Sequence, residues 1–473
     1  MGKINLLIII ISLVFASCQN QKVIDKEYFT ENPPNIVLIM ADDLGWGDTG
    51  YNGNAIIQTP NIDKMASEGL VFNRFYSSSP VCSPTRGSCL TGRHPYRYGI
   101  FSANVGHIPQ EEILLSEKLK SRGYVSGHFG KWHLGTLSRD MKDSNRGGKD
   151  HLEHFAPPWE NGFDVCFSTE AKLPTYDPML TPLGWQGNRD REKSFGTFYW
   201  DEQGDLVTQN LEGDDSEIIM DRVIPFIEKS VREEKPFFAV IWFHAPHLPV
   251  LADSLHRTLY AGYSNEEENY FGCITAMDEQ IGRLNAKLED LKTSENTMIW
   301  FTSDNGPEGK LQNQDFPGSA GKLRGRKRSL YEGGIRVPGI LKWPLMVDEG
   351  RTTDMPASTL DYFPTIVEIL DIEKADDMEP IDGISLWPLM IGDVNQRNKP
   401  IYFESGKQLA LTTNQFKAYS SDQGENFELY DLFEDPGENT DLSSKFPDIV
   451  AEYKELLVKW QKSCQNRLAG ADY

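Results

Sequence analysis

The pattern of hydrophobic positions predicts a sheet that is buried on both faces. Uninterrupted apolar runs, typical of strands that helices cover on both sides, occupy residues 35–40, 236–243 and 297–301. Segments with helical spacing lie between and around them, at 60–69, 111–122 and 266–291. Strands that alternate with helices in this way predict an α/β fold with a large, mostly parallel sheet sandwiched by helices.

The pattern changes after about residue 396. Three short strands at hairpin spacing are predicted, followed by a helix, at 400–403, 409–413, 416–419 and about 448–461. We therefore expect a large α/β domain at 34–395 and a small C-terminal α+β subdomain, an antiparallel sheet plus helix, at 396–473. Residues 140–210 are rich in Gly, Pro and Trp and are predicted to be surface loops rather than core.

The first residues are predicted to be a targeting segment. A positive charge at Lys3 precedes an apolar run at 6–15, which is too short to span a bilayer. The small residues directly before Cys18 resemble a bacterial lipobox, in which the cysteine is lipidated; ordinary cleavage near Ser17 is the alternative. We therefore expect a lipoprotein-type signal peptide at 1–17 and a tether at 18–33. The mature chain would be exported to the periplasm or cell surface as an outer-membrane lipoprotein of a Gram-negative bacterium.

Charge and cysteine content exclude several classes of protein. The 473 residues include 47 Lys and Arg against 70 Asp and Glu, a net charge of −23. So acidic a surface argues against nucleic acid as a partner, and against membrane contact other than through a lipid anchor. One small basic pocket for an anionic ligand remains compatible with this balance. No Cys-x-x-Cys pair indicates structural zinc, and disulfide pairing stays open among Cys89, Cys166, Cys273 and Cys464.

Polar side chains follow the predicted strands at the edge where open parallel sheets bind ligands. The strand 35–40 runs into two aspartates, and the others run into an Asp-Asn pair, two histidines and a Gly-Lys-Trp-His segment. For any one of them a helix cap or a turn is the alternative explanation. Together they predict one polar site, formed by Asp42, Asp43, Asp304, Asn305, His244, His247, Lys131 and His133.

Four of these residues offer only oxygen ligands: Asp42, Asp43, Asp304 and Asn305. Oxygen ligands without a thiolate suit Ca²⁺ or Mg²⁺ rather than Zn²⁺. The adjacent aspartates repel each other unless a cation lies beside them. Because calcium tolerates irregular geometry better than magnesium, we favour Ca²⁺, with Mg²⁺ as the alternative.

The segment Cys82-Ser83-Pro84-Thr85-Arg86 is the most specific motif in the chain. Pro84 suits the first turn of a helix, where its missing N–H costs nothing. Cys82 then lies at the helix N-terminus, where free amides and the helix dipole favour an anion. Arg86 lies one turn away on the same face. Taken alone, such a cysteine is either a thiolate nucleophile or a small buried residue.

These motifs resemble a known family. Cys-x-Pro-x-Arg followed by Thr-Gly-Arg, with the Asp-Asp, Gly-Lys-Trp-His and Asp-Asn-Gly elements, is similar to the type I, formylglycine-dependent sulfatases over nearly all of 34–460. The resemblance implies an alkaline-phosphatase-like fold and makes 34–395 the sulfatase catalytic domain. It implies that a formylglycine-generating or sulfatase-maturing enzyme oxidises Cys82 to formylglycine (3-oxoalanine). It also implies that this residue joins the four oxygen ligands at the metal.

The resemblance further implies a sulfate pocket, formed by Arg86, Lys131, His133, His247 and Lys327. We choose His247 over His244 because the family's histidine precedes x-Pro, as His247 does. In the hypothetical mechanism, one hydroxyl of hydrated formylglycine attacks sulfur, and His247, helped by Lys327, protonates the leaving alkoxide oxygen. The second hydroxyl then loses its proton to His133, which ejects sulfate and regenerates the aldehyde. His133 packing beside Trp132 is the alternative. The loop at 323–328 departs from the family pattern, so Arg326 and Arg328 either contact substrate or belong to a solvated basic loop.

Export and aromatic loops favour a sulfated polysaccharide or oligosaccharide as substrate, with exo action expected from the family's usual closed pocket. Four aromatic residues are candidates for stacking on sugar rings, with loop core as the alternative: Trp159, Trp185, Tyr199 and Trp200. A phosphonate or phosphate ester hydrolase of the same superfamily is the nearest competing function. An inactive glycan-binding lipoprotein and a calcium-stabilised scaffold are weaker alternatives, because they leave the basic residues unexplained.

Overall fold

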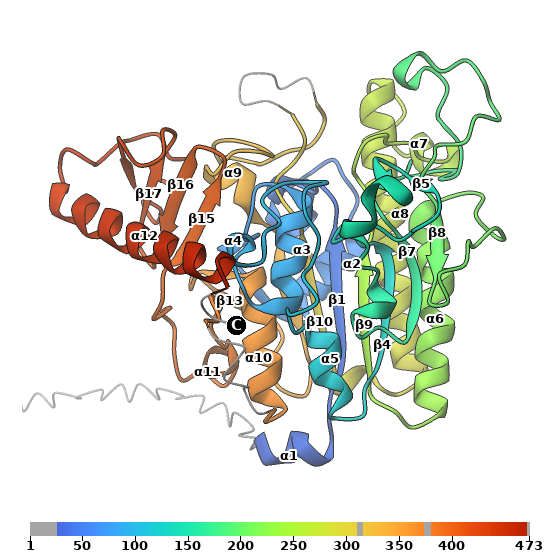
Figure 1. The fold of residues 1–473 in the computed structure, drawn as a ribbon, viewed down its shortest axis with the longest axis horizontal. Coiled ribbons are helices and arrows are strands. Elements are labelled where there is room, and N and C mark those ends of the chain that lie inside the picture. The colour runs from blue at the N-terminus through green and yellow to red at the C-terminus, as the bar shows by residue number, and fades with distance from the viewer. Residues whose placement is uncertain (1–25, 310–315, 373–379, 471–473) are drawn as a thin grey trace, which may run out of the picture.

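The computed structural model describes residues 26–309, 316–372 and 380–470. The predicted signal peptide and the first half of the predicted tether, residues 18–25 with Cys18, lie outside these residues. Within them, no helix has both the length and the apolarity needed to cross a membrane. The first described element is the short helix α1 (Lys26–Glu31), which lies at the end of the molecule opposite the carboxyl ends of the central strands (Figure 1).

A nine-stranded sheet forms the centre of the molecule, in the order β13-β2-β12-β10-β1-β9-β4-β7-β8 (Figure 1). The five consecutive strands from β10 to β7 are parallel, which confirms the predicted mostly parallel α/β sheet. Their bounds are β10 (Thr297–Ser303), β1 (Asn35–Ala41), β9 (Phe237–Trp242), β4 (Val125–Lys131) and β7 (Val165–Thr169). The outer strands are β13 (Arg351–Thr353), β2 (Leu70–Phe72), β12 (Gly339–Lys342) and β8 (Tyr199–Asp201).

Helices cover both faces of this sheet, as the uninterrupted apolar strands predicted. Alternate residues of β1 point into two separate cores: Ile36 and Leu38 into one, Val37 and Ile39 into the other. The first core is completed by α3 (Cys82–Thr91), α5 (Leu115–Lys120), α10 (Tyr362–Ile369) and α11 (Trp387–Met390). The second is completed by α2 (Pro60–Ser67), α6 (Asp215–Arg232) and α8 (Asn265–Asp290). The central strands β1, β9 and β10 are therefore buried on both sides.

The prediction that residues 140–210 are surface loops is wrong in part. This segment supplies β7 and β8, the last two strands on one side of the sheet. Phe167 and Tyr199 stack in parallel in the core with ring centroids 3.9 Å apart. The strands were missed because β7 ends in polar residues and β8 has only three residues. Neither therefore shows the long apolar run on which the prediction depended.

One predicted helix is shorter than expected. The helix predicted at 111–122 is α5, which begins only at Leu115. Its N-cap is Leu114, whose backbone N–H donates to the Glu117 carboxylate at 2.8 Å. This bond satisfies an amide that has no partner within the helix, so the helix starts there and residues 111–114 lie outside it.

The C-terminal part of the chain forms the predicted α+β subdomain beside the main sheet (Figure 1). Its antiparallel strands are β15 (Ile401–Ser405), β16 (Gln408–Thr412), β17 (Phe416–Ser420) and β18 (Glu428–Asp431), and its helix is α12 (Pro447–Leu468). β18 was not predicted as a strand. A buried ion pair joins the two parts, because Lys417 Nζ of the subdomain lies 3.0 Å from Glu332 of the main domain. Lys417 also lies 2.8 Å from Glu438 of its own subdomain, and that carboxylate accepts from the backbone N–H of Glu332 at 2.7 Å. These contacts tie the subdomain to the main domain.

Candidate active site

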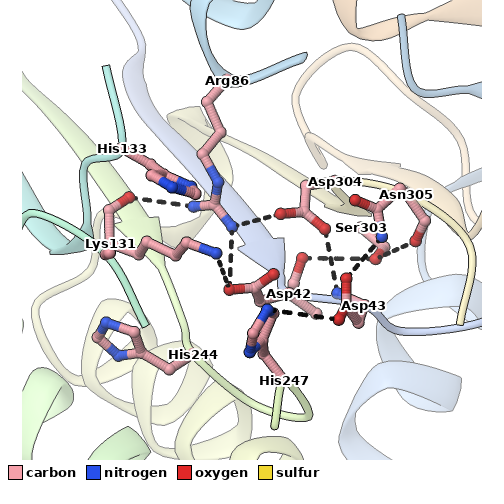
Figure 2. Close-up of polar contacts among 12 residues, drawn as sticks. Asp42, Asp43, Arg86, Lys131, His133, His244, His247, Ser303, Asp304 and Asn305 are labelled. Carbon is pink, nitrogen blue, oxygen red and sulfur yellow. Dashed lines mark hydrogen bonds and ion pairs between the residues drawn. The ribbon is translucent and has the colours of Figure 1, made fainter. Parts of the chain in front are cut away.

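Four neighbouring strands bring the predicted polar residues together at one edge of the sheet. β10, β1, β9 and β4 lie side by side, and each ends in polar side chains that point to a common centre (Figure 2). Asp42 and Asp43 follow β1, and Asp304 follows β10. Asp43 has a left-handed backbone, with φ of 68°, so its carboxylate reaches back to the centre from the turn after the strand.

The centre of the site is a cluster of buried carboxylates. Asp42, Asp43 and Asp304 are at most 1% exposed. Burial and the neighbouring Asp42 raise the pKa of Asp304 to about 6. Burial has the same tendency at Asp43, but Lys327 and His247 outweigh it and hold the pKa of that carboxyl well below its usual value. Three acids packed this closely require positive charge around them.

Three cations surround the carboxylates, and each makes a short ion pair. Lys131 Nζ lies 2.6 Å from Asp42, and Arg86 Nη2 lies 2.6 Å from Asp304. Lys327 Nζ donates to Asp43 at 2.7 Å. Burial opposes charge on Lys131 and Lys327, but the carboxylates prevail and raise the pKa of both. All three side chains therefore remain charged at neutral pH, and positive charge gathers in an otherwise acidic protein.

Cys82 lies beside this cluster as the first residue of α3. Its Sγ and one carboxylate oxygen each from Asp42 and Asp304 lie within 4.8 Å of one another. Burial raises the pKa of the Cys82 thiol. A cysteine that attacks as a thiolate needs a lowered pKa, so this environment does not suit a thiolate nucleophile.

The donor set fits a hard cation. Oδ1 of Asp42 and Oδ1 of Asn305 are buried and have no hydrogen-bond partner among the described residues. Buried oxygens of this kind are normally satisfied, and a cation would satisfy both while reducing the repulsion between the carboxylates. Ligation by Asn305 is compatible with its other contact, since its Nδ2 donates to Asp43 at 2.7 Å and leaves Oδ1 free.

The two candidate histidines after β9 have different positions. His247 Nε2 lies 3.7 Å from Asp43, and the side chain lines the pocket. His244 is fully buried behind the site, where its ring bonds to Asp215 at 2.7 Å and to Thr169 at 2.8 Å. Burial, helped by Lys327 and Lys131, lowers the pKa of His247 well below its usual value. This ring is therefore neutral when no anion is bound.

His133 lies on the opposite side of the site and also faces the pocket. Its Nε2 donates to Asn104 Oδ1 at 2.9 Å, which leaves Nδ1 as an acceptor with no partner among the described residues. Burial and the charges of Lys131 and Arg86 lower the pKa of His133 well below its usual value. It is therefore a neutral ring with a free lone pair, rather than a side chain that only packs on Trp132.

A cavity of about 500 Å³ opens above these residues. Cys82, Lys131, His133, His247 and Lys327 form its floor, and Ser405 and Gly406 of the C-terminal subdomain contribute to its wall. Arg328 also lines it, with its guanidinium held by Glu308 at 2.6 Å. Arg326 instead donates to the backbone carbonyls of Glu308 and Gly318, so it is a loop-stabilising residue.

The structure corrects two of the residues proposed to stack on sugars. Tyr199 is 0% exposed and Trp200 is 5% exposed, and both pack in the core. Trp159 packs partly against the core, and Trp185 remains partly accessible in a loop near the pocket. The cysteines Cys82, Cys89, Cys166, Cys273 and Cys464 are all buried and free, so no disulfide forms among the described residues.

Lys172 and Asn104 are among the pocket residues that sequence reasoning missed. Lys172 follows β7 by three residues. Had β7 been recognised as a strand, the rule that parallel strands deliver ligand-binding residues at their carboxyl ends would have indicated it. Asn104 lies in an irregular loop with φ of 60°, and no sequence pattern marks it.

Comparison with known proteins identifies the family. A family model described as sulfatase matches residues 34–372, and one described as N-sulphoglucosamine sulphohydrolase, C-terminal, matches residues 325–463. N-acetylgalactosamine-6-sulfatase of Homo sapiens is 32% identical over 483 residues, covering 91% of this chain and 87% of the relative.

Solved structures agree with this assignment. The crystal structure of Ps i-CgsB in complex with k-i-k-neocarrahexaose is 28% identical, has a TM-score of 0.78, and covers 90% of this chain and 92% of that chain. The phosphonate monoester hydrolase of Agrobacterium radiobacter shares the fold, with a TM-score of 0.66 at 19% identity, covering 91% of this chain and 96% of that chain. The chain belongs to the sulfatase family, with its alkaline-phosphatase-like fold, and is a sulfuric ester hydrolase.

Proposed function

We propose that the protein removes sulfate from sulfated oligosaccharides or polysaccharides, using a formylglycine made from Cys82 and a calcium ion. The observation that carries this proposal is the position of Cys82. It lies at the start of α3, where its Sγ and one carboxylate oxygen each from Asp42 and Asp304 lie within 4.8 Å of one another. Its buried thiol has a raised pKa. A side chain in this position is suited to modification and metal contact rather than to thiolate attack.

The residues that would hold the cation are Asp42, Asp43, Asp304 and Asn305, together with residue 82. When present, the hydrated formylglycine supplies a hydroxyl nucleophile, and the cation makes that hydroxyl more acidic and offsets charge on the sulfate. Arg86, Lys131 and Lys327 are placed to hold the sulfate oxygens. Neutral His133 presents Nδ1 as a proton acceptor, and its orientation is fixed by Asn104.

The leaving sugar oxygen needs a proton because an alkoxide is a poor leaving group. His247 and Lys327 both face Asp43 and lie together on the pocket floor. Burial, helped by Lys327 and Lys131, holds the pKa of His247 down, and a bound sulfate anion would offset the charge of the two lysines and raise that pKa. The ring would thus gain its proton as substrate binds, and we assign it the role of general acid, with Lys327 beside it.

The His247→Ala variant tests this role through the leaving group. We expect turnover of a sugar sulfate to fall about 10²- to 10⁴-fold, whereas an aryl sulfate, whose phenolate leaves without a proton, should lose much less. The measurement is kcat for both ester types with the same enzyme samples. A matched control is His244→Gln, which changes the histidine three residues away that lies behind the site. Equal losses on the two esters in His247→Ala would exclude the general-acid role.

Sulfated carbohydrate is supported as the substrate class by the relatives. One is named for action on N-acetylgalactosamine 6-sulfate, and another was solved with a neocarrahexaose. The open cavity with Trp185 nearby is compatible with a sugar. The sulfatase-maturing partner, and export with lipidation at Cys18, are part of the same proposal and are supported by the Cys-x-Pro-x-Arg motif and the lipobox-like segment.

The competing function is hydrolysis of phosphate or phosphonate esters, because the fold is shared with such an enzyme. One purified sample, assayed on a sulfated sugar, an aryl sulfate, an aryl phosphate diester and an aryl phosphonate, separates the two. We expect the highest kcat/KM on sulfate esters. Faster cleavage of the phosphate diester or phosphonate would refute the sulfatase proposal, and binding of sulfated glycans without turnover of any ester would favour the inactive glycan-binding alternative.

A further inference from the structure

Lys172 differs from every other cation that lines the pocket. Lys131 and Lys327 each bond to an aspartate, and Arg328 bonds to Glu308. Lys172 lines the same cavity but forms no ion pair or side-chain hydrogen bond among the described residues. Its Nζ lies over the ring of Trp185, 5.5 Å from the centroid. The aromatic ring positions the ammonium group without neutralising it.

The other cations of the site are sufficient to hold the sulfate that is removed, so Lys172 is not needed there. Lys131 and Lys327 already line the cavity floor, with Arg86 buried behind them, and each of the three is matched by a carboxylate. Lys172 therefore adds a positive charge that no carboxylate among the described residues pairs with. A partly buried cation without a counter-ion is unfavourable, and burial together with Lys131 and Lys327 lowers its pKa. An anion arriving with the substrate would relieve this cost.

The position of Lys172 indicates which part of the substrate it would contact. Lys172 and His247 line the same cavity, and His247 is the residue assigned to the leaving oxygen. Lys172 therefore faces the space that the sugar would occupy. Trp185, beside it, offers an apolar face of the size that sugar rings contact. Together they form a place for a charged sugar substituent.

We propose that Lys172, supported by Trp185, binds a second anionic group of the substrate, a sulfate or a carboxylate on the sugar next to the sulfate being removed. This inference rests on the proposed function and adds a selectivity to it. The enzyme would favour sugars that carry at least two negative groups over sugars that carry only the target sulfate. An oxyanion paired with an ammonium in a partly dry pocket makes a charge-assisted hydrogen bond.

The test uses the full mature chain with residue 82 converted, and three oligosaccharides that share one target sulfate. The first has no other charge, the second has an additional sulfate, and the third has a uronate carboxylate. Variants are Lys172→Met, which keeps the length of the side chain, and Lys172→Arg, which keeps its charge. Lys193→Met is the matched control, because Lys193 is an exposed lysine that does not line the pocket.

We expect Lys172→Met to lower the preference for dianionic over monoanionic substrate, measured as the ratio of kcat/KM values, by about tenfold to a hundredfold. The change should lie mainly in KM, and Lys172→Arg should restore most of it. Binding to the Cys82→Ser background by calorimetry should show the same loss of preference without any turnover. Lys193→Met should leave the ratio as it is.

The possible outcomes separate the inference about Lys172 from the proposed sulfatase function. An unchanged ratio in Lys172→Met, or an equal loss on all three substrates, would overturn the assignment of Lys172 to a second anion. Loss only with the disulfated sugar identifies sulfate as the second group, and loss only with the uronate identifies carboxylate. If the wild-type enzyme cleaves none of the three and no aryl sulfate, the proposed function itself is wrong. Turnover without any effect of Lys172 refutes only the present inference.

Discussion

Replacement of Cys82 by alanine is expected to reduce sulfate ester hydrolysis on the order of 10⁶-fold, the loss typical of removing a catalytic nucleophile. The reason is that the remaining groups only bind and polarise the sulfate. Arg86, Lys131 and Lys327 hold oxygen atoms, and no other side chain on the pocket floor is suited to attack sulfur. The fold should persist, because Cys82 lies at a helix terminus and alanine leaves only a small void there. Circular dichroism and thermal unfolding check that point.

The control for this variant is Cys89→Ala on the same helix. Cys89 is 1% exposed, packs in the core and does not line the pocket. It should lose some stability and retain activity. The second measurement is the mass of the peptide that contains residue 82 in active wild-type protein. An unmodified cysteine there, in a sample that is fully active, would contradict formylglycine chemistry. The Cys82 thiolate would then be the candidate nucleophile.

The central part of the fold could be predicted because its physical requirements are strong. The strand 35–41 is buried on both faces from its second residue onward, so residues 36–41 must be apolar and the sequence shows an unbroken run there. The strands β7 and β8, at one side of the sheet, are not subject to this constraint. β7 ends in Ser168 and Thr169, and β8 is three residues long. Short and partly polar strands form through contacts distant in sequence, which no local pattern records.

The same distinction applies to the site. The carboxylates at the ends of β1 and β10 could be predicted, because parallel strands deliver their last residues to one edge. Which cation pairs with which carboxylate could not be predicted. That Lys131 bonds to Asp42 and Lys327 to Asp43, while Lys172 bonds to neither, depends on side-chain positions within a few ångströms. Only the folded structure shows which cation is left without a partner.

Removal of the proposed cation is expected to abolish activity and to lower thermal stability, because it leaves the carboxylates of Asp42, Asp43 and Asp304 buried together. Prolonged dialysis against a chelator, followed by titration with Ca²⁺ or Mg²⁺, should show recovery of both properties, with calcium effective at the lower concentration. At a hundredfold excess over Kd, binding should stabilise the fold by about 2.7 kcal/mol. Activity that survives thorough chelation would rule out a catalytic cation.

The thermal shift caused by calcium can be separated from catalysis by choice of variant. Cys82→Ala should be inactive and yet retain most of the shift, since the four oxygen ligands remain. Asp42→Asn should lose most of it, because this change removes a charged ligand whose Oδ1 is the buried oxygen without a partner. Asp48→Asn is the matched control, since Asp48 is an equally buried aspartate that bonds to Tyr270 and lies outside the ligand set. A calcium shift that persists in Asp42→Asn but disappears in Asp48→Asn would place the cation elsewhere in the molecule.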